Sequence, residues 1–269
     1  ANSGLTPDVP VRTFKRAKEL LEGAGYFGKG ANIYICDTVY VEKGDENWGF
    51  SAGGQVTNTQ SGQTWTPVVK PYDTLRYTMI SVGPENSWGN PPVVTLTLSH
   101  ITIDVDKKDI TIVKCGEGNN ANKTLILEDG AVITGANSDG SSLFAGTGTM
   151  IMEGGEIRDN TVSDLYNAGM INVATFQMKG GKICNNQISG SRGVALIMGE
   201  DEASVQIMGG TIEENQIKSV DGIGSAIYIT VDEYEDMTCE ISGGIIRKNG
   251  GTRASAIYYA AEYKANSPR

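Results

Sequence analysis

Apolar and polar residues alternate in short segments that recur along the second half of the chain. Each segment runs into a pair of glycines, followed by a single isoleucine and, three residues after it, an asparagine. Four copies of this G-G-x-I-x-x-N motif begin at Gly154, Gly180, Gly209 and Gly243, so that successive copies start 26, 29 and 34 residues apart. Alternation with a period of two residues predicts β-strands.

Further strands are predicted on both sides of the motif. A second strand follows the asparagine of each repeat after a variable polar gap, at residues 169–173, 193–198, 225–229 and 255–259. Weaker copies of the unit occupy residues 125–132 and 96–104, and other strands are expected at 32–41, 66–70, 79–82 and 110–113. At about 27 residues per repeat, the chain has room for roughly eight coils.

Short strands joined by tight glycine turns at this period predict an all-β fold, the right-handed parallel β-helix of pectin-lyase-like solenoids. Successive coils would lie about 4.8 Å apart and be joined by parallel backbone hydrogen bonds. A leucine-rich repeat is the competing interpretation, because Met152, Ile157 and Asn160 fit part of its pattern. The glycine at the place of a leucine and the β-like return segments favour the β-helix.

The asparagine of the motif should fall at the same turn in every coil. Its amide can bond the amides of the asparagines above and below it. We therefore expect a structural asparagine ladder, with a ligand-binding row of asparagines as the alternative. The four ladder positions are Asn160, Asn186, Asn215 and Asn249.

The N-terminal segment has a different period. Phe14, Ala17, Leu20 and Leu21 recur at helical spacing, and Thr13 can act as the N-cap. A short amphipathic helix over residues 12–23 would cover the open end of the core.

The whole chain, residues 1–269, is interpreted as one β-helix domain. The capping helix is followed by irregular coils with aromatic loops over residues 32–115, and then by regular coils over residues 124–261. The repeat continues almost to the last residue, so we expect the chain to be a segment of a longer protein.

These features resemble the bacterial surface β-helix family, including the repeats of chlamydial polymorphic membrane proteins and of very large surface proteins of gut Firmicutes. The resemblance is carried by the G-G-x-I-x-x-N motif, by the Phe14, Ala17, Leu20 and Leu21 pattern, and by residues 38–41 and 98–104. It implies display at a bacterial cell surface or outside the cell, and an adhesin-like or scaffolding role.

Composition and charge exclude several other classes. Glycine contributes 35 of 269 residues, which fits a chain with many tight turns. A balance of 22 basic against 32 acidic residues gives a net charge of −10, which argues against nucleic acid as a partner. No apolar stretch is long enough to insert into a membrane. The cysteines lack metal-ligand spacing, so that buried thiols are favoured over a disulfide or zinc; they are Cys36, Cys115, Cys184 and Cys239.

Candidate chemistry is sparse, and no catalytic residue or cofactor is assigned. Asp104 and Asp106 are the nearest approach to a paired carboxylate on one strand face, with a solvated turn as the simpler interpretation. His100 is interpreted as a structural or surface residue. Acidic loops at residues 200–202 and 232–236 are places for adventitious Ca²⁺, although no metal site is predicted.

The aromatic residues gather in the irregular N-terminal part. Long polar loops with aromatic rings can stack on sugars, because the C–H faces of sugars pack on aromatic rings. The alternative is that these rings cover the first coils. The candidate ligand-binding residues are Trp48, Trp65, Trp88, Tyr72 and Tyr77.

The sequence thus predicts a non-catalytic, extracellular or cell-surface scaffold with an adhesin-like or ligand-binding role. Its partner would be a host or bacterial surface glycan or protein. Two alternatives stay open: a polysaccharide lyase or glycosidase of the pectin-lyase-like fold, and a glycan-binding module that uses the tryptophan-rich loops.

Overall fold

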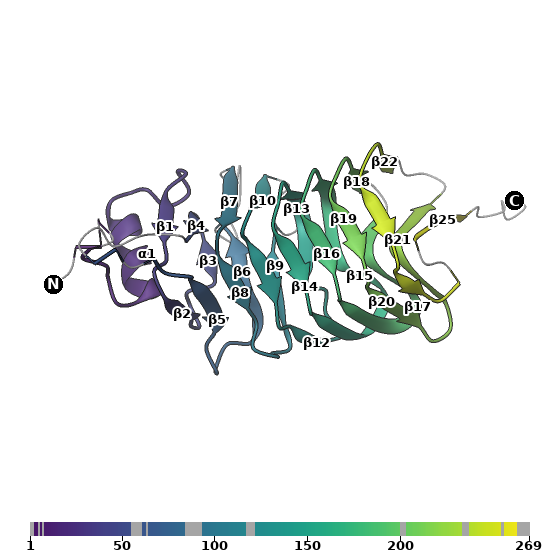
Figure 1. The fold of residues 1–269 in the computed structure, drawn as a ribbon, viewed down its shortest axis with the longest axis horizontal. Helices are drawn as coiled ribbons and strands as arrows, with labels where there is room; N and C mark the ends of the chain where they lie inside the picture. Colours follow the sequence, from purple (N-terminus) through teal and green to yellow (C-terminus); the bar gives the residue numbers. More distant parts are fainter. Residues whose placement is uncertain are drawn as a thin grey trace, which may run out of the picture.

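The chain forms a parallel β-solenoid whose long axis runs from the N-terminal helix to the last strands (Figure 1). The computed structural model describes residues 3–4, 6, 8–54, 61–62, 64–83, 93–116, 122–199, 203–232, 237–253 and 256–262. Within these ranges the only helix is α1 (Phe14–Gly23), and it is too short to cross a membrane. The expectation of an all-β parallel β-helix is confirmed.

One wall of the solenoid is a parallel sheet of eight strands, one from each level. Its consecutive strands enclose about seven turns of chain, against roughly eight predicted from the repeat length. The turns are of unequal length, from 24 residues between Val132 and Glu156 to 34 between Val68 and Thr102. The strands are β2 (Thr38–Val41), β5 (Val68–Pro71), β8 (Thr102–Asp104), β11 (Val132–Thr134), β14 (Glu156–Arg158), β16 (Lys182–Cys184), β19 (Thr211–Glu213) and β23 (Ile245–Arg247).

The remaining strands form a sheet of seventeen strands that supplies the other walls. The strands that lead into the glycine pairs, or into the equivalent turns, are β1 (Asn32–Tyr34), β4 (Ser51–Gly53), β7 (Val94–Ser99), β10 (Lys123–Leu127), β13 (Phe144–Met152), β15 (Thr161–Met178), β18 (Ser204–Ile207) and β22 (Thr238–Ile241). The others are β3 (Asn47–Trp48), β6 (Tyr77–Val82), β9 (Ile110–Lys114), β12 (Asn137–Asp139), β17 (Gln187–Gly199), β20 (Gln216–Ser219), β21 (Ile223–Asp232), β24 (Gly250–Gly251) and β25 (Ile257–Glu262).

The return segments of the repeat are strands, so the leucine-rich repeat interpretation is wrong. β15 and β17 run through the corners of their coils as continuous strands and pair in parallel, with local shifts of register. Inward side chains stack in columns along the axis, as the alternation predicts. In one such column Leu98, Leu127 and Met152 follow one another in register and are fully buried.

The two glycines of the motif have different structural roles. The first lies against the preceding coil, since a Cβ on Gly180 would come within 2.3 Å of the Glu153 carbonyl oxygen. The second has a left-handed backbone, with φ of +78° at Gly181, a conformation that costs glycine least. Each copy of the turn repeats both features, which is why the motif contains two glycines.

The N-terminal end is closed by α1 and by aromatic rings. Thr13 caps the helix by accepting the Arg16 N–H at 3.2 Å. The Phe14 ring packs 4.9 Å from the ring of Trp48 and 5.7 Å from that of Phe50, measured between centroids. Trp48 is fully buried, and its Nε1 donates to the Asp45 carbonyl at 3.1 Å. The predicted capping helix is therefore present and covers the first coils.

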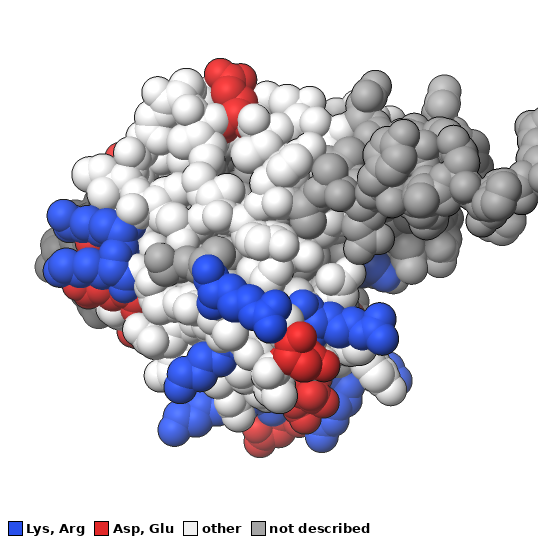
Figure 2. Space-filling model, turned by 90° about the vertical axis from the view of Figure 1, so that its right-hand side faces the viewer, with Lys and Arg blue, Asp and Glu red and all other residues white. Residues whose placement is uncertain are grey.

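The C-terminal end, which faces the viewer in Figure 2, has no such cover among the described residues. Ile241 and Ile257 continue the inward columns of the preceding coil but are partly exposed. Lys and Arg side chains gather along the described lower part of this end (Figure 2).

The asparagines of the motif form a buried ladder along one corner. The Asn186 backbone N–H and Nδ2 both donate to Asn215 Oδ1, at 3.0 and 2.9 Å. Asn186 Oδ1 in turn accepts the backbone N–H and Nδ2 of Asn160, at 3.1 and 3.0 Å. Asn249 accepts the same pair of bonds from Asn215. The residue before each asparagine has a left-handed backbone, as at Asn185 with φ of +56°.

Replacing a ladder asparagine should destabilise the fold strongly. Asn186→Ala leaves the buried N–H of Asn160 without its acceptor and the Ile157 carbonyl without the 3.0 Å bond from Asn186 Nδ2. Each unsatisfied group costs about 1–3 kcal/mol, so we expect a loss of about 3 kcal/mol or more in urea unfolding. Gln187→Ala, which removes an exposed amide from the next position, should change stability little. Equal effects of the two substitutions would contradict the ladder.

Candidate functional site

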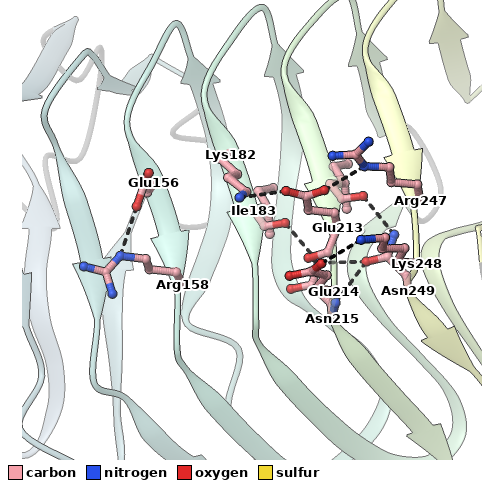
Figure 3. Close-up of polar contacts among 11 residues, drawn as sticks. Glu156, Arg158, Lys182, Ile183, Glu213, Glu214, Asn215, Arg247, Lys248 and Asn249 are labelled. Carbon is pink, nitrogen blue, oxygen red and sulfur yellow. Dashed lines mark hydrogen bonds and ion pairs between the residues drawn. The ribbon is translucent and has the colours of Figure 1, made fainter.

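The outward face of the eight-stranded sheet carries stacked charged side chains (Figure 3). On this face Arg158, Cys184, Glu213 and Arg247 occupy equivalent positions in successive strands. Arg158 pairs with Glu156 of its own strand at 3.0 Å, and Lys248 of the neighbouring turn pairs with Glu214 at 3.2 Å. The charges are thus neutralised within the face.

Glu213 is the centre of this charge arrangement. Its Oε1 lies 2.7 Å from Lys182 Nζ and its Oε2 lies 2.7 Å from Arg247 Nε, so the carboxylate joins three successive coils. Only 9% of the side chain is exposed. The hydrogen bonds from Lys182 and then Arg247 lower the pKa of Glu213 from 4.5 to about 2. A carboxylate with so low a pKa is a poor proton acceptor. Its role is therefore to link neighbouring coils, and it is unsuited to acid–base chemistry.

Asp104 and Asp106, the nearest approach to paired carboxylates, do not both belong to a strand. Strand β8 ends at Asp104, and Asp106 follows in a turn with a left-handed backbone, φ +54°, so the two do not share a strand face. Asp104 Oδ1 accepts the Asp106 backbone N–H at 3.1 Å, and its Oδ2 lies 3.0 Å from Lys70 Nζ. The hydrogen bond to Asp104 raises the pKa of Lys70. Both aspartates shape a solvated turn, which was the simpler interpretation.

An open groove lies at the turns that lead into the eight-stranded sheet. It has a volume of about 350 Å³ and is lined by His100, Glu128, Asp129 and Glu153 from successive coils. The His100 backbone is left-handed, φ +50°, and its N–H donates to the Asp129 carbonyl at 3.1 Å. Glu153 is paired with Lys179 at 3.0 Å. Residues of three successive coils thus line one groove, a placement that sequence reasoning about His100 alone missed.

Metal ligands are not gathered anywhere in the described part of the chain. No group of three or more His, Cys, Asp or Glu residues is placed there to hold an ion. The acidic loops proposed for Ca²⁺ fall largely outside the described residues, at 200–202 and 233–236. All four cysteines are free thiols. Cys115 and Cys184 are buried, and burial raises the pKa of Cys115 to about 12, whereas Cys239 is exposed.

The five aromatic candidates do not form one surface. Trp48 belongs to the core, and this burial removes it from the candidate ligand-binding residues. Trp65 is half-buried, and Trp88 lies outside the described residues. Tyr72 and Tyr77 are exposed, and the Tyr72 ring meets that of Tyr40 edge to face at 6.2 Å.

A second aromatic surface, which the sequence did not indicate, lies at a corner of the C-terminal coils. The guanidinium of Arg192 in β17 lies 5.0 Å from the centroid of the Tyr166 ring in β15. Both residues fall in the variable segment between the ladder asparagine and the second strand, where the repeat has no fixed pattern. The two residues are 26 residues apart, which is also the offset between paired residues such as Thr161 and Gln187, so the stacking of the two coils brings them close; the local shift of register places Tyr166 opposite Ser191.

Comparisons of the chain with protein-family models, with curated proteins and with solved structures find no match. The fold is therefore shown by the structure alone.

The low pKa of Glu213 predicts a specific dependence of stability on pH. The unfolded state binds a proton near the ordinary value of 4.5, whereas the folded state keeps the carboxylate ionised to about pH 2. The stabilisation is therefore complete above about pH 4.5 and is lost as the pH falls towards 2. Glu213→Gln should flatten this part of the profile of urea midpoint against pH.

Glu214→Gln is the matched control, because Glu214 follows Glu213 directly and pairs with Lys248 of the neighbouring turn, but both side chains are well exposed. This variant should keep the acid slope of the parent chain. An unchanged slope in Glu213→Gln would contradict the assigned role of Glu213.

Proposed function

We propose that the chain is a non-catalytic β-solenoid scaffold of an extracellular or cell-surface bacterial protein, with an adhesin-like or ligand-binding role. This proposal rests on the observation that the repeated residues make their contacts with neighbouring coils. The glycines, isoleucines and asparagines of the motif face neighbouring coils, and Glu213 is occupied by Lys182 and Arg247. The regular coils thus build a rod, and ligand contacts would fall to the segments that vary.

The cellular setting rests on the resemblance to bacterial surface β-helix proteins. In such proteins a solenoid holds surfaces away from the cell, and its partner is a host or bacterial surface glycan or protein. The exposed Tyr72 and Tyr77 rings support the narrower proposal of a glycan-binding module in the N-terminal coils. Half-buried Trp65 is a further candidate in the same coils, and buried Trp48 is not.

A polysaccharide lyase or glycosidase is the second candidate function, favoured by one observation. The groove at His100 presents Glu128, Asp129 and Glu153 to solvent, and paired carboxylates flanking a glycosidic bond are the usual catalytic groups of glycosidases. The ion pair between Glu153 and Lys179 weighs against a general acid at Glu153, because a nearby cation favours the ionised carboxylate.

Binding and product release decide between these functions. We expect saturable binding to members of a panel of mucin, uronate and bacterial surface glycans, measured by biolayer interferometry. No new reducing or unsaturated ends should appear, with or without Ca²⁺. Trp65→Ala, Tyr72→Ala and Tyr77→Ala test the N-terminal surface, where loss of binding in a folded variant would locate it.

Product release would establish the enzyme instead, provided that it depends on the groove. In that case Glu153→Gln should abolish turnover, while Glu156→Gln, on the outward sheet face beside Arg158, should leave it unchanged. Absence of binding to every glycan and to intact bacterial or host cells would reject the proposed scaffold role.

A further inference from the structure

The corner where β15 and β17 pair with shifted register departs from the repeat in its backbone. Asp164, Asn167 and Arg192 all have left-handed backbones, with φ of +52°, +45° and +67°. None of the three occupies the turn before a ladder asparagine, where the left-handed backbone recurs in every regular coil. Backbone of this kind is costly for residues other than glycine, and it concentrates at functional positions.

The strained backbone presents an aromatic ring and a guanidinium together. Tyr166 is 59% exposed, and the Arg192 guanidinium lies over its ring. The Arg192 backbone N–H is fixed by Asp221 Oδ1 at 2.7 Å, which holds the residue at the corner. Within the described part of the chain, the Arg192 side chain forms no ion pair. It therefore keeps its five hydrogen-bond donors for another group.

A second pair of rings reaches the same corner from later coils. The Tyr228 and Tyr258 rings are stacked, with centroids 5.3 Å apart and planes 21° from parallel. The tip of the Tyr228 ring lies over Gly193, where a Cβ would be 3.2 Å from Tyr228 Cζ and 3.1 Å from Asn167 Oδ1. Buried Tyr228 thus lies between partly buried Tyr258 and the segment of Gly193, next to the Asn167 amide.

Two more cations lie on the neighbouring coils of this corner. Lys218 is in register with Ser189, three residues before Arg192, and Arg253 pairs with Gly224, which is in register with Val194. Both are exposed, and neither forms an ion pair among the described residues. Asp164 and Asp221 are the carboxylates nearby, so three cations face two anions on a chain whose net charge is −10.

We propose that this basic aromatic corner, made of Tyr166, Asn167, Arg192, Lys218, Arg253 and Tyr258, binds an acidic polysaccharide through its carboxylate or sulfate groups. Arg192 supplies the planar, bidentate donors that suit such oxyanions. The exposed Tyr166 ring and the partly buried Tyr258 ring supply apolar faces for sugar C–H groups. The cations of Arg192 and Arg253 stand two coils apart, about 10 Å along the axis, which suits a ligand that repeats its charge. The inference deepens the proposed ligand-binding role and rests on it.

The test measures binding of the whole chain to four defined probes by isothermal titration calorimetry. Polygalacturonate carries only carboxylates, dextran sulfate carries only sulfates, dextran is neutral, and poly-glutamate is an anionic polymer without sugar rings. We expect binding to one or both acidic polysaccharides, and none to dextran. Equal binding of poly-glutamate would overturn the assignment of a sugar ligand in favour of an acidic peptide.

The variants locate the site. Arg192→Gln should raise the Kd about tenfold or more, because hydrogen bonds to charged groups carry that much affinity. Arg192→Lys, which keeps the charge but not the planar fork, should recover only part of the loss. Lys218→Gln should also weaken binding. Because Lys218 does not have a left-handed backbone, this substitution should leave the conformation of the corner unchanged. Lys43→Gln, an exposed cation of the N-terminal coils, is the matched control and should bind like the parent chain.

Thermal unfolding of each variant by circular dichroism establishes that it is folded. If the parent chain binds polygalacturonate or dextran sulfate while Arg192→Gln and Lys218→Gln bind as well as it does, the corner is not the site, although a ligand-binding role stands. If the chain binds neither acidic polysaccharide but binds other glycans, this inference fails and the scaffold proposal survives.

Discussion

Every coil of this solenoid has to satisfy its backbone polar groups through the coils on either side of it. Along the walls, parallel strand pairing does this directly. At the corner after the eight-stranded sheet the pairing is interrupted, and the asparagine amide takes its place. Asn186 shows how: its Nδ2 bonds the Ile157 carbonyl and the next amide, while its Oδ1 accepts from Asn160. An apolar residue here would leave buried donors and acceptors without partners, which costs more than the bonds contribute when they are made.

The rest of the motif follows from keeping that amide in place. The left-handed residue before the asparagine turns its side chain inward, and the first glycine lets the turn approach the coil below. The residues on the outward face of the eight-stranded sheet can then vary from coil to coil, provided that side chains of opposite charge lie next to each other in neighbouring coils. Glu213 between Lys182 and Arg247 meets this condition. The same stacking rule requires a cover at the first coil, and α1 with Phe14 on Trp48 provides it.

The sequence predicted most of the regular part, because one period governs both the strands and their burial. Strands β14, β16, β19 and β23, the asparagine ladder and the capping helix were all visible in the spacing of residues. Trp48 was misjudged because its neighbours in sequence are polar; only the register of the irregular first coils turns it inward. The groove at His100 was missed for a related reason. His100 and Asp129 are 29 residues apart and meet only because equivalent turns of successive coils stack.

Two sets of left-handed residues other than glycine, among the twelve in the described structure, differ in their relation to the repeat. Asp159, Asn185, Glu214 and Lys248 recur before each ladder asparagine, so their cost is offset by the amide bonds that they position. Asp164, Asn167 and Arg192 lie outside the ladder turns and position no ladder asparagine. They lie beside the contact between the Arg192 guanidinium and the Tyr166 ring. The repeated residues of this solenoid hold its coils together. A ligand-specific surface can therefore arise in a segment that does not follow the repeat, without disturbing the stacking of the coils.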